Sequence, residues 1–265
     1  MTAQMPGLFV SHGSPMLALD EGPAHSYLRE LGKRLGKPSG IVVISAHHEE
    51  EVPTVTTNAA PTTIHDFGGF PRALFEMTYP APGSPILADQ VRAALAARGI
   101  ASRGDAERGL DHGVWVPLSL MFPAADIPVV SLSVEPHLDT AYHFALGEAL
   151  RPLREKDILI VGSGSITHNL RELARPTPDA AAAPWAAAFT DWIGAQVAAR
   201  NIDGLLDYRA RAPEARRAHP TEEHFLPFFA ALGAARADEP MTRLHRSFTY
   251  GSLGMDVYAF GEMPR

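Results

Sequence analysis

Histidine follows three short apolar segments in this chain of 265 residues. Residues 8–11 lead to His12, residues 41–46 lead to His47, and residues 158–167 lead to His168. Continuous runs of Val, Ile and Leu are typical of strands that are buried on both faces of a parallel sheet. Ligands bind at the carboxyl ends of such strands. Three histidines at one edge of one sheet therefore indicate a metal site or an acid–base site.

Composition restricts the ligands that such a site can serve. The chain has 23 basic and 30 acidic residues, a net charge of −7, which argues against nucleic-acid binding. It has no cysteine, so a metal would take histidine, carboxylate or water ligands. Residues 1–7 lack the features of a secretory signal, and no apolar run is long enough to span a membrane. We therefore expect a cytoplasmic protein with no nucleic-acid or membrane partner.

The apolar pattern predicts one α/β domain over residues 1–265. It indicates strands near 8–11, 41–46, 52–57, 127–134, 158–161 and 255–260, and helices near 24–35, 86–98, 142–153 and 187–200. Two further segments are predicted as loops. Residues 58–85 are rich in Pro, Gly and aromatic residues, which favours an ordered loop that walls a pocket. Residues 109–117 carry His112 beside Gly113.

Two other catalytic or binding motifs are incomplete in this chain. The segment Gly162-Ser163-Gly164 follows a strand, but a dinucleotide-binding fingerprint needs a third glycine where Thr167 stands. A nucleophile elbow needs glycine two residues before and two residues after its serine, and Ser163 has neither. We expect the glycines to permit a sharp turn that presents His168.

A second pair of histidines, His219 and His224, lies near the end of the chain. Their separation is five residues and a proline follows the first, so they do not share a helical face as zinc-protease motifs require. At most one is a ligand, and His224, at the start of a helix that Thr221 is expected to cap, is the better candidate. His219 would then be a loop histidine that lines the pocket. We prefer His47 to His48 as a ligand because the charged residues 49–51 that follow indicate a solvated segment, and neighbouring side chains of a strand point to opposite faces.

Taken together, these segments resemble a known family. The residues that carry the resemblance are 11–15, 45–47, 64–71, 111–113, 167–169 and 219–227, in an order that spans nearly the whole chain. They resemble the class III extradiol aromatic ring-opening dioxygenases, related to the catalytic subunit of protocatechuate 4,5-dioxygenase, and within them the DOPA 4,5-dioxygenase-like proteins. The resemblance implies a single three-layer α/β domain with a mixed, mainly parallel central sheet flanked by helices.

The resemblance also implies a non-haem Fe(II) that binds a catechol and O₂. Its motifs imply that His12, His47 and His224 are the metal ligands. They imply that His168 is the acid–base residue. His112 would donate a hydrogen bond to bound oxygen or substrate, and His65 would contact the substrate. With these partners the protein would act on small molecules, as a monomer or a small homo-oligomer.

One feature departs from the wider superfamily, where two histidines and one carboxylate hold the iron. The matching position here is His224, although Glu222 or Glu223 could instead supply the carboxylate; the order of the motifs favours His224. The result is an all-histidine site that also suits Zn(II). Two alternative functions therefore stay open. One is a zinc-binding homologue without oxygenase activity that acts as an interaction protein, and the other is a zinc hydrolase.

Overall fold

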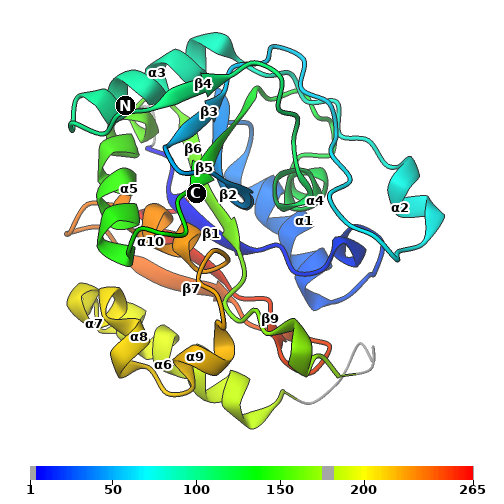
Figure 1. Ribbon diagram of the computed structural model, residues 1–265, viewed down its shortest axis with the longest axis vertical. Helices are drawn as coiled ribbons and strands as arrows, with labels where there is room; N and C mark the ends of the chain where they lie inside the picture. The colour runs from blue at the N-terminus through cyan, green and yellow to red at the C-terminus, as the bar shows by residue number, and fades with distance from the viewer. Residues whose placement is uncertain (1–3, 175–181, 265) are drawn as a thin grey trace.

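The computed structural model describes residues 4–174 and 182–264, which form a single α/β domain around one large sheet (Figure 1). In that part of the chain the sheet has eight strands in the order β4-β3-β5-β2-β6-β1-β10-β7. The strands are β1 (Gly7–Ser11), β2 (Gly40–Glu49), β3 (Thr54–Thr56), β4 (Arg103–Asp105), β5 (Val129–Val134), β6 (Ile158–Gly164), β7 (Met241–His245) and β10 (Val257–Phe260). The predicted α/β domain with a mixed, mainly parallel sheet is confirmed.

The centre of the sheet is parallel. Strands β5, β2, β6 and β1 pair in parallel, whereas β10 pairs antiparallel to both β1 and β7. The predicted strands correspond to β1, β2, β3, β5, β6 and β10, and β2 runs three residues further than predicted, to Glu49. Strands β4 and β7 were not predicted. They are the two edges of the sheet, where polar, partly exposed residues replace the apolar runs that mark a buried strand.

Helices cover both faces of the sheet (Figure 1). Alternate residues of β2 point to opposite faces. Ile41 and Val43 pack in one core cluster with α1 and α4, and Val42 and Ile44 pack in another with α3 and α5. A third cluster joins β10 to α6 and α10. The helices, with the 3₁₀ turns η1 and η2, are η1 (Pro15–Ala18), α1 (Pro23–Leu35), α2 (Arg72–Glu76), α3 (Pro85–Ala96), α4 (His112–Met121), α5 (Thr140–Arg154), η2 (Leu170–Glu172), α6 (Pro184–Ala198), α7 (Ile202–Leu206), α8 (Tyr208–Arg211), α9 (Ala215–Ala218) and α10 (Leu226–Gly233).

One predicted loop is wrong, because α4 begins at His112 within residues 109–117, and the other, residues 58–85, contains the short helix α2. The Asp111 side chain accepts a hydrogen bond from the Val114 N–H and caps the helix. Gly113 and Pro117 both disfavour a helix interior, which is why the sequence pattern indicated a loop. Burial of the whole helix outweighs these local preferences, since nine of its ten residues are buried.

The helix start predicted at Thr221 is also wrong. Residues 221–225 form a bend and a turn, and α10 begins at Leu226, with Pro227 in its first turn. Proline suits the first turn of a helix because its missing N–H has no intrahelical partner there. The Thr221 hydroxyl donates to the Glu223 carboxylate instead of capping the helix. His224 therefore lies in the turn that leads into α10.

A short hairpin near the turn that carries His224 is a separate two-stranded sheet. It consists of β8 (Phe248–Thr249) and β9 (Leu253–Gly254). Within the described part of the chain, no helix is long and apolar enough to cross a membrane.

Candidate metal centre

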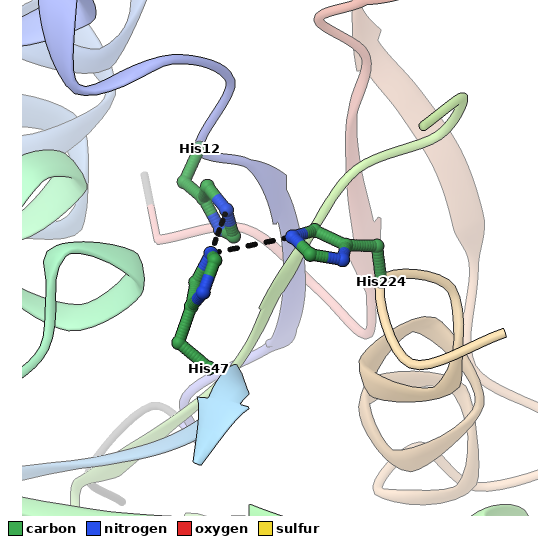
Figure 2. Close-up of side chains that lie close together, drawn as sticks. All are labelled: His12, His47 and His224. Atoms are coloured by element: carbon green, nitrogen blue, oxygen red, sulfur yellow. Dashed lines mark hydrogen bonds between the residues drawn. The ribbon is translucent and has the colours of Figure 1, made fainter. Parts of the chain in front are cut away.

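Three histidines from distant parts of the chain point toward one another (Figure 2). His12 follows β1, His47 lies in β2, and His224 lies in the turn before α10. The Nε2 atom of His47 is 3.1 Å from that of His12 and 3.2 Å from that of His224. His12 and His47 lie at the carboxyl ends of β1 and β2, two parallel strands on either side of β6, where ligands are expected.

Hydrogen bonds on the far side of each ring indicate which nitrogen carries its proton. The Ser163 hydroxyl donates to the Gly113 carbonyl oxygen, so it accepts from His12 Nδ1 at 3.0 Å. His224 Nδ1 donates to the Glu223 carboxylate at 2.9 Å. Because each Nδ1 donates, each Nε2 has a free lone pair that faces the other rings.

A metal ion fits this arrangement of acceptors. A cation between the three Nε2 atoms, which lie 3.1 and 3.2 Å apart, would bind the free lone pairs of His12 and His224, and that of His47 when its proton is on Nδ1. Two imidazole nitrogens at metal-bonding distance are about 2.9 Å apart at a right angle and about 3.4 Å apart at a tetrahedral angle. The residues thus form a cluster that can bind a metal, held by partners of the kind that orient metal-binding histidines.

Burial keeps these rings neutral. Burial lowers the pKa of His12 and of His224 well below the ordinary value, and the neighbouring histidines lower both further. For His47, burial and the nearby His112 lower the pKa to about 3, against the attraction of Asp66. Neutral imidazole is the form that binds a metal, so the three rings are ready for one at neutral pH.

His112 and Asp66 form a pair beside His47. The carboxylate of Asp66 accepts the backbone N–H of His112 at 2.9 Å, and His112 Nδ1 lies 2.9 Å from the same oxygen. Burial alone would raise the pKa of Asp66, but the hydrogen bonds and charge of His112 lower it to about 2. The centroids of the His112 and His47 rings are 3.9 Å apart. Asp66, which also lies 3.6 Å from His47 Nδ1, therefore connects the two histidines.

His168 stacks on His224 from the loop after β6. The two ring centroids are 3.4 Å apart and the planes differ by 12°. The Nδ1 atom of His168 lies 3.9 Å from the Glu223 carboxylate. Burial lowers the pKa of His168 to about 4, and the charge of Glu223 opposes that shift. His168 is therefore neutral at neutral pH and can accept a proton.

A cavity of about 540 Å³, which we call the metal cavity, opens over these rings. Its histidines are His47, His112, His168 and His224. Asp66, Phe67 and Phe70 from the predicted wall loop line it, together with apolar side chains near η2 and the β8–β9 hairpin. A planar aromatic molecule with polar edges suits such a lining.

Three of the histidines that do not line the metal cavity support its walls or lie near its strands, namely His65, His48 and His219. His65, predicted to contact substrate, hydrogen-bonds through Nε2 to the Met77 carbonyl oxygen and packs edge-on against Phe67. It supports the aromatic wall from behind. His48 is buried on the opposite face of β2, where its Nδ1 hydrogen-bonds to Ser131 Oγ.

His219 is buried as well. It donates from Nε2 to the Ile166 carbonyl oxygen and stacks on Phe225. These contacts join the loop that carries His168 to the turn that carries His224. Of the candidate residues, the structure brings together His12, His47, His112, His168 and His224.

The partners that orient the rings could not be recognised from the sequence pattern. Asp66 and Glu223 lie in a loop and in a turn, so neither has a strand or helix pattern that points to the site. Ser163 was examined only as a possible nucleophile. Asp111 carries the clearest signal, because a helix cap is often an aspartate, and it also accepts a hydrogen bond from Ser45 at 2.7 Å.

Comparison with known proteins gives one family. Residues 6–261 match the family described as the catalytic LigB subunit of aromatic ring-opening dioxygenase. A protein of Beta vulgaris named 4,5-DOPA dioxygenase extradiol is 43% identical over 256 residues, with 95% of each chain covered. A protein of the same name from Portulaca grandiflora is 41% identical over 262 residues, with 95% of this chain and 94% of that protein covered.

A solved structure agrees with the fold. The crystal structure of an uncharacterised protein from Escherichia coli K12 superposes with a TM-score of 0.82 at 34% identity. The match covers 97% of this chain and 100% of the other.

Proposed function

The chain belongs to the family of the catalytic LigB subunit of aromatic ring-opening dioxygenase, and we propose that it opens the ring of a catechol with O₂ by means of Fe(II). It is an extradiol dioxygenase by class. The proposed substrate is DOPA or a similar catecholic compound, as the names of its relatives suggest. The observation that carries the proposal is the convergence of three Nε2 atoms, 3.1 and 3.2 Å apart, beside an aromatic-walled cavity.

His12, His47 and His224 would hold the metal. Fe(II) bound there supplies a Lewis acid that lowers the pKa of a catechol hydroxyl and a redox centre for O₂. The three ligands are neutral and leave the positive charge of the ion uncompensated, which favours an anionic catecholate as its partner. Ser163 and Glu223 keep the two outer rings in the tautomer that binds.

His168 would be the base that takes the second hydroxyl proton. Its ring lines the metal cavity and is neutral, and Glu223 lies close enough to stabilise the imidazolium that forms. The proton taken in this way would later be returned to the opened product. His112, whose backbone N–H donates to the Asp66 carboxylate, would donate its one ring N–H to an oxygen of the substrate. Phe67 and Phe70 would pack against the ring and exclude water.

Oxygen uptake tests the proposal. The protein is stripped of metal, reloaded anaerobically with Fe(II), and mixed with air and DOPA, caffeate, protocatechuate or catechol. We expect uptake of one O₂ per catechol and a yellow ring-opened product. No uptake with iron demonstrably bound would reject the dioxygenase. Hydrolysis of chromogenic esters by the zinc form would then favour a zinc hydrolase, and inactivity of both forms would favour a binding protein.

Replacing the proposed base separates its role from metal binding. The variant His168→Ala should lose turnover, by a factor of about 10²–10⁴, and keep its iron content. Loss of iron as well would instead make His168 a fourth ligand. His137→Ala is the matched control, because His137 is exposed and lies outside the metal cavity, so this variant should keep both iron and turnover.

A further inference from the structure

A second cavity, of about 520 Å³, adjoins the metal cavity. We call it the side cavity. Ser14 and Tyr250 line both cavities, and Ser14 follows His12 by only two residues. Two residues span at most about 7.6 Å between Cα atoms, so the side cavity begins within one substituent's length of a proposed metal ligand.

The wall between the two cavities is thin. Gly13 lines the metal cavity and Met255 lines the side cavity. A Cβ atom on Gly13 would lie 2.6 Å from the Met255 methyl carbon, and Gly13 has φ +62°, a conformation that favours glycine. These two residues therefore pack directly against each other, with no further layer of side chains between the cavities.

The charged side chains and the buried imidazole that line the side cavity present hydrogen-bond acceptors to it. Asp20 and Glu21 contribute two carboxylates, and the lining within the described residues contains neither lysine nor arginine. His25 is 6% exposed and its Nδ1 donates to the Leu17 carbonyl oxygen at 2.9 Å. The remaining nitrogen, Nε2, is then an acceptor in the neutral ring, and it has no hydrogen-bond partner among the described residues.

A protonated amine matches this set of groups. It supplies three N–H donors and one positive charge, and so satisfies both the carboxylates and the imidazole acceptor. A carboxylate would face Asp20 and Glu21 and be repelled by them.

We propose that the side cavity is a subsite for the ring substituent of the substrate, and that it selects substituents that carry a protonated amine over those that carry only a carboxylate. This inference rests on the proposed ring-opening function. It adds to that function a second binding region and a charge preference. Catechols with an aminoethyl side chain, or with an α-amino-acid side chain, belong to the selected class.

Paired substrates test the preference through turnover. The Fe(II)-loaded protein is assayed with dopamine and with 3-(3,4-dihydroxyphenyl)propionate, which differ chiefly in the charge of the side chain. We expect a higher kcat/KM for dopamine. Asp20 and Glu21 are exposed, and two exposed charge pairs contribute about fivefold together. Asp20→Asn combined with Glu21→Gln should therefore lower kcat/KM for dopamine about fivefold and leave the propionate unchanged or faster. Glu30→Gln, an exposed residue on α1 outside the lining, should change neither.

Binding without turnover tests the same subsite separately. Tyramine and 3-(4-hydroxyphenyl)propionate lack the second hydroxyl, and their dissociation constants are measured by calorimetry on the anaerobic Fe(II) protein. Tighter binding of tyramine that is lost in the double variant supports the subsite. Equal kcat/KM for both catechols, or a preference that the double variant keeps, overturns it. Absence of any turnover, with the tyramine preference intact, counts against the proposed function and not against the subsite.

Discussion

Replacing Glu135 by Gln should change how the stability of the protein depends on pH. Glu135 follows β5, is fully buried, and accepts a hydrogen bond from Ser133 Oγ at 2.6 Å. Its second oxygen has no hydrogen-bond partner and lies 3.8 Å from His143 Nε2, which already accepts the Glu135 backbone N–H. Burial raises the pKa of this carboxyl from 4.5 to about 7, and the charge of Glu50 adds to the shift, against the hydrogen bond from Ser133.

The sign and size of the effect follow from proton binding. Between pH 4.5 and 7 the folded protein keeps a proton on Glu135 that the unfolded chain has lost, so stability falls as pH rises. Each pH unit costs about 1.4 kcal/mol, and the whole interval costs about 3 kcal/mol. A glutamine side chain at this position cannot ionise. The variant should therefore gain about 3 kcal/mol relative to the native protein between pH 4.5 and pH 8.

Urea denaturation at a series of pH values measures this difference. EDTA is added so that metal binding, which depends on pH itself, does not contribute. Other titrating groups, including His143 with its pKa lowered by burial to about 4, are present in both proteins and largely cancel. Glu51→Gln is the control, because Glu51 is exposed, and its curve should run parallel to that of the native protein. Parallel curves for Glu135→Gln as well would refute the reasoning.

Three further changes test how the site is supported. Gly164→Ala places a Cβ atom 2.1 Å from the His224 carbonyl oxygen, so it should displace that ligand, weaken metal binding and cost about 1–3 kcal/mol. Arg154→Met removes a fully buried guanidinium that donates to Glu239 and to two carbonyl oxygens, and should cost about 3–5 kcal/mol without changing the metal affinity of the folded protein. His219→Leu leaves a buried carbonyl oxygen unpaired and should cost about 1–3 kcal/mol and lower turnover.

Metal content, turnover and unfolding midpoints distinguish these outcomes. Gly22→Ala is the control for the metal content and unfolding midpoint of the glycine variant, since a Cβ atom there meets nothing within 4 Å. His219→Gln keeps a donor near Ile166 and should recover part of the turnover that His219→Leu loses. Unchanged metal binding in Gly164→Ala would contradict the claim that the backbone at this position holds the ligand. Full turnover in His219→Leu would make His219 a packing residue only.

The strand-borne part of the site could be predicted from the sequence. His12, His47 and His168 each follow an apolar run, and such runs form the parallel centre of the sheet because burial on both faces selects Val, Ile and Leu. Parallel strands end at one edge, so the histidines meet there. The same reasoning could not find the edge strands β4 and β7, whose residues are partly exposed and whose position depends on pairing with distant segments.

The partners of the histidines were not predictable in this way. Asp66 and Glu223 reach the site from a loop and a turn whose paths are set by long-range contacts, and a carboxylate in a loop is usually solvated. The start of α10 shows the same limit, because Thr221 is a good helix cap by type and yet the first helical turn begins five residues later, at Leu226. The residue type at a position indicates where a helix can begin, but the packing of the following segment determines where it does begin.

Pro117 shows how a residue that disfavours a helix can serve the site. In a regular helix its N–H would bond to the Gly113 carbonyl oxygen, but proline has no N–H to give. That oxygen instead accepts the Ser163 hydroxyl, which uses the only proton of the serine. Ser163 must then accept from His12 Nδ1, and the lone pair of His12 Nε2 is left facing the other two rings. The proline that made α4 look like a loop thus helps to set the tautomer of a metal-binding histidine.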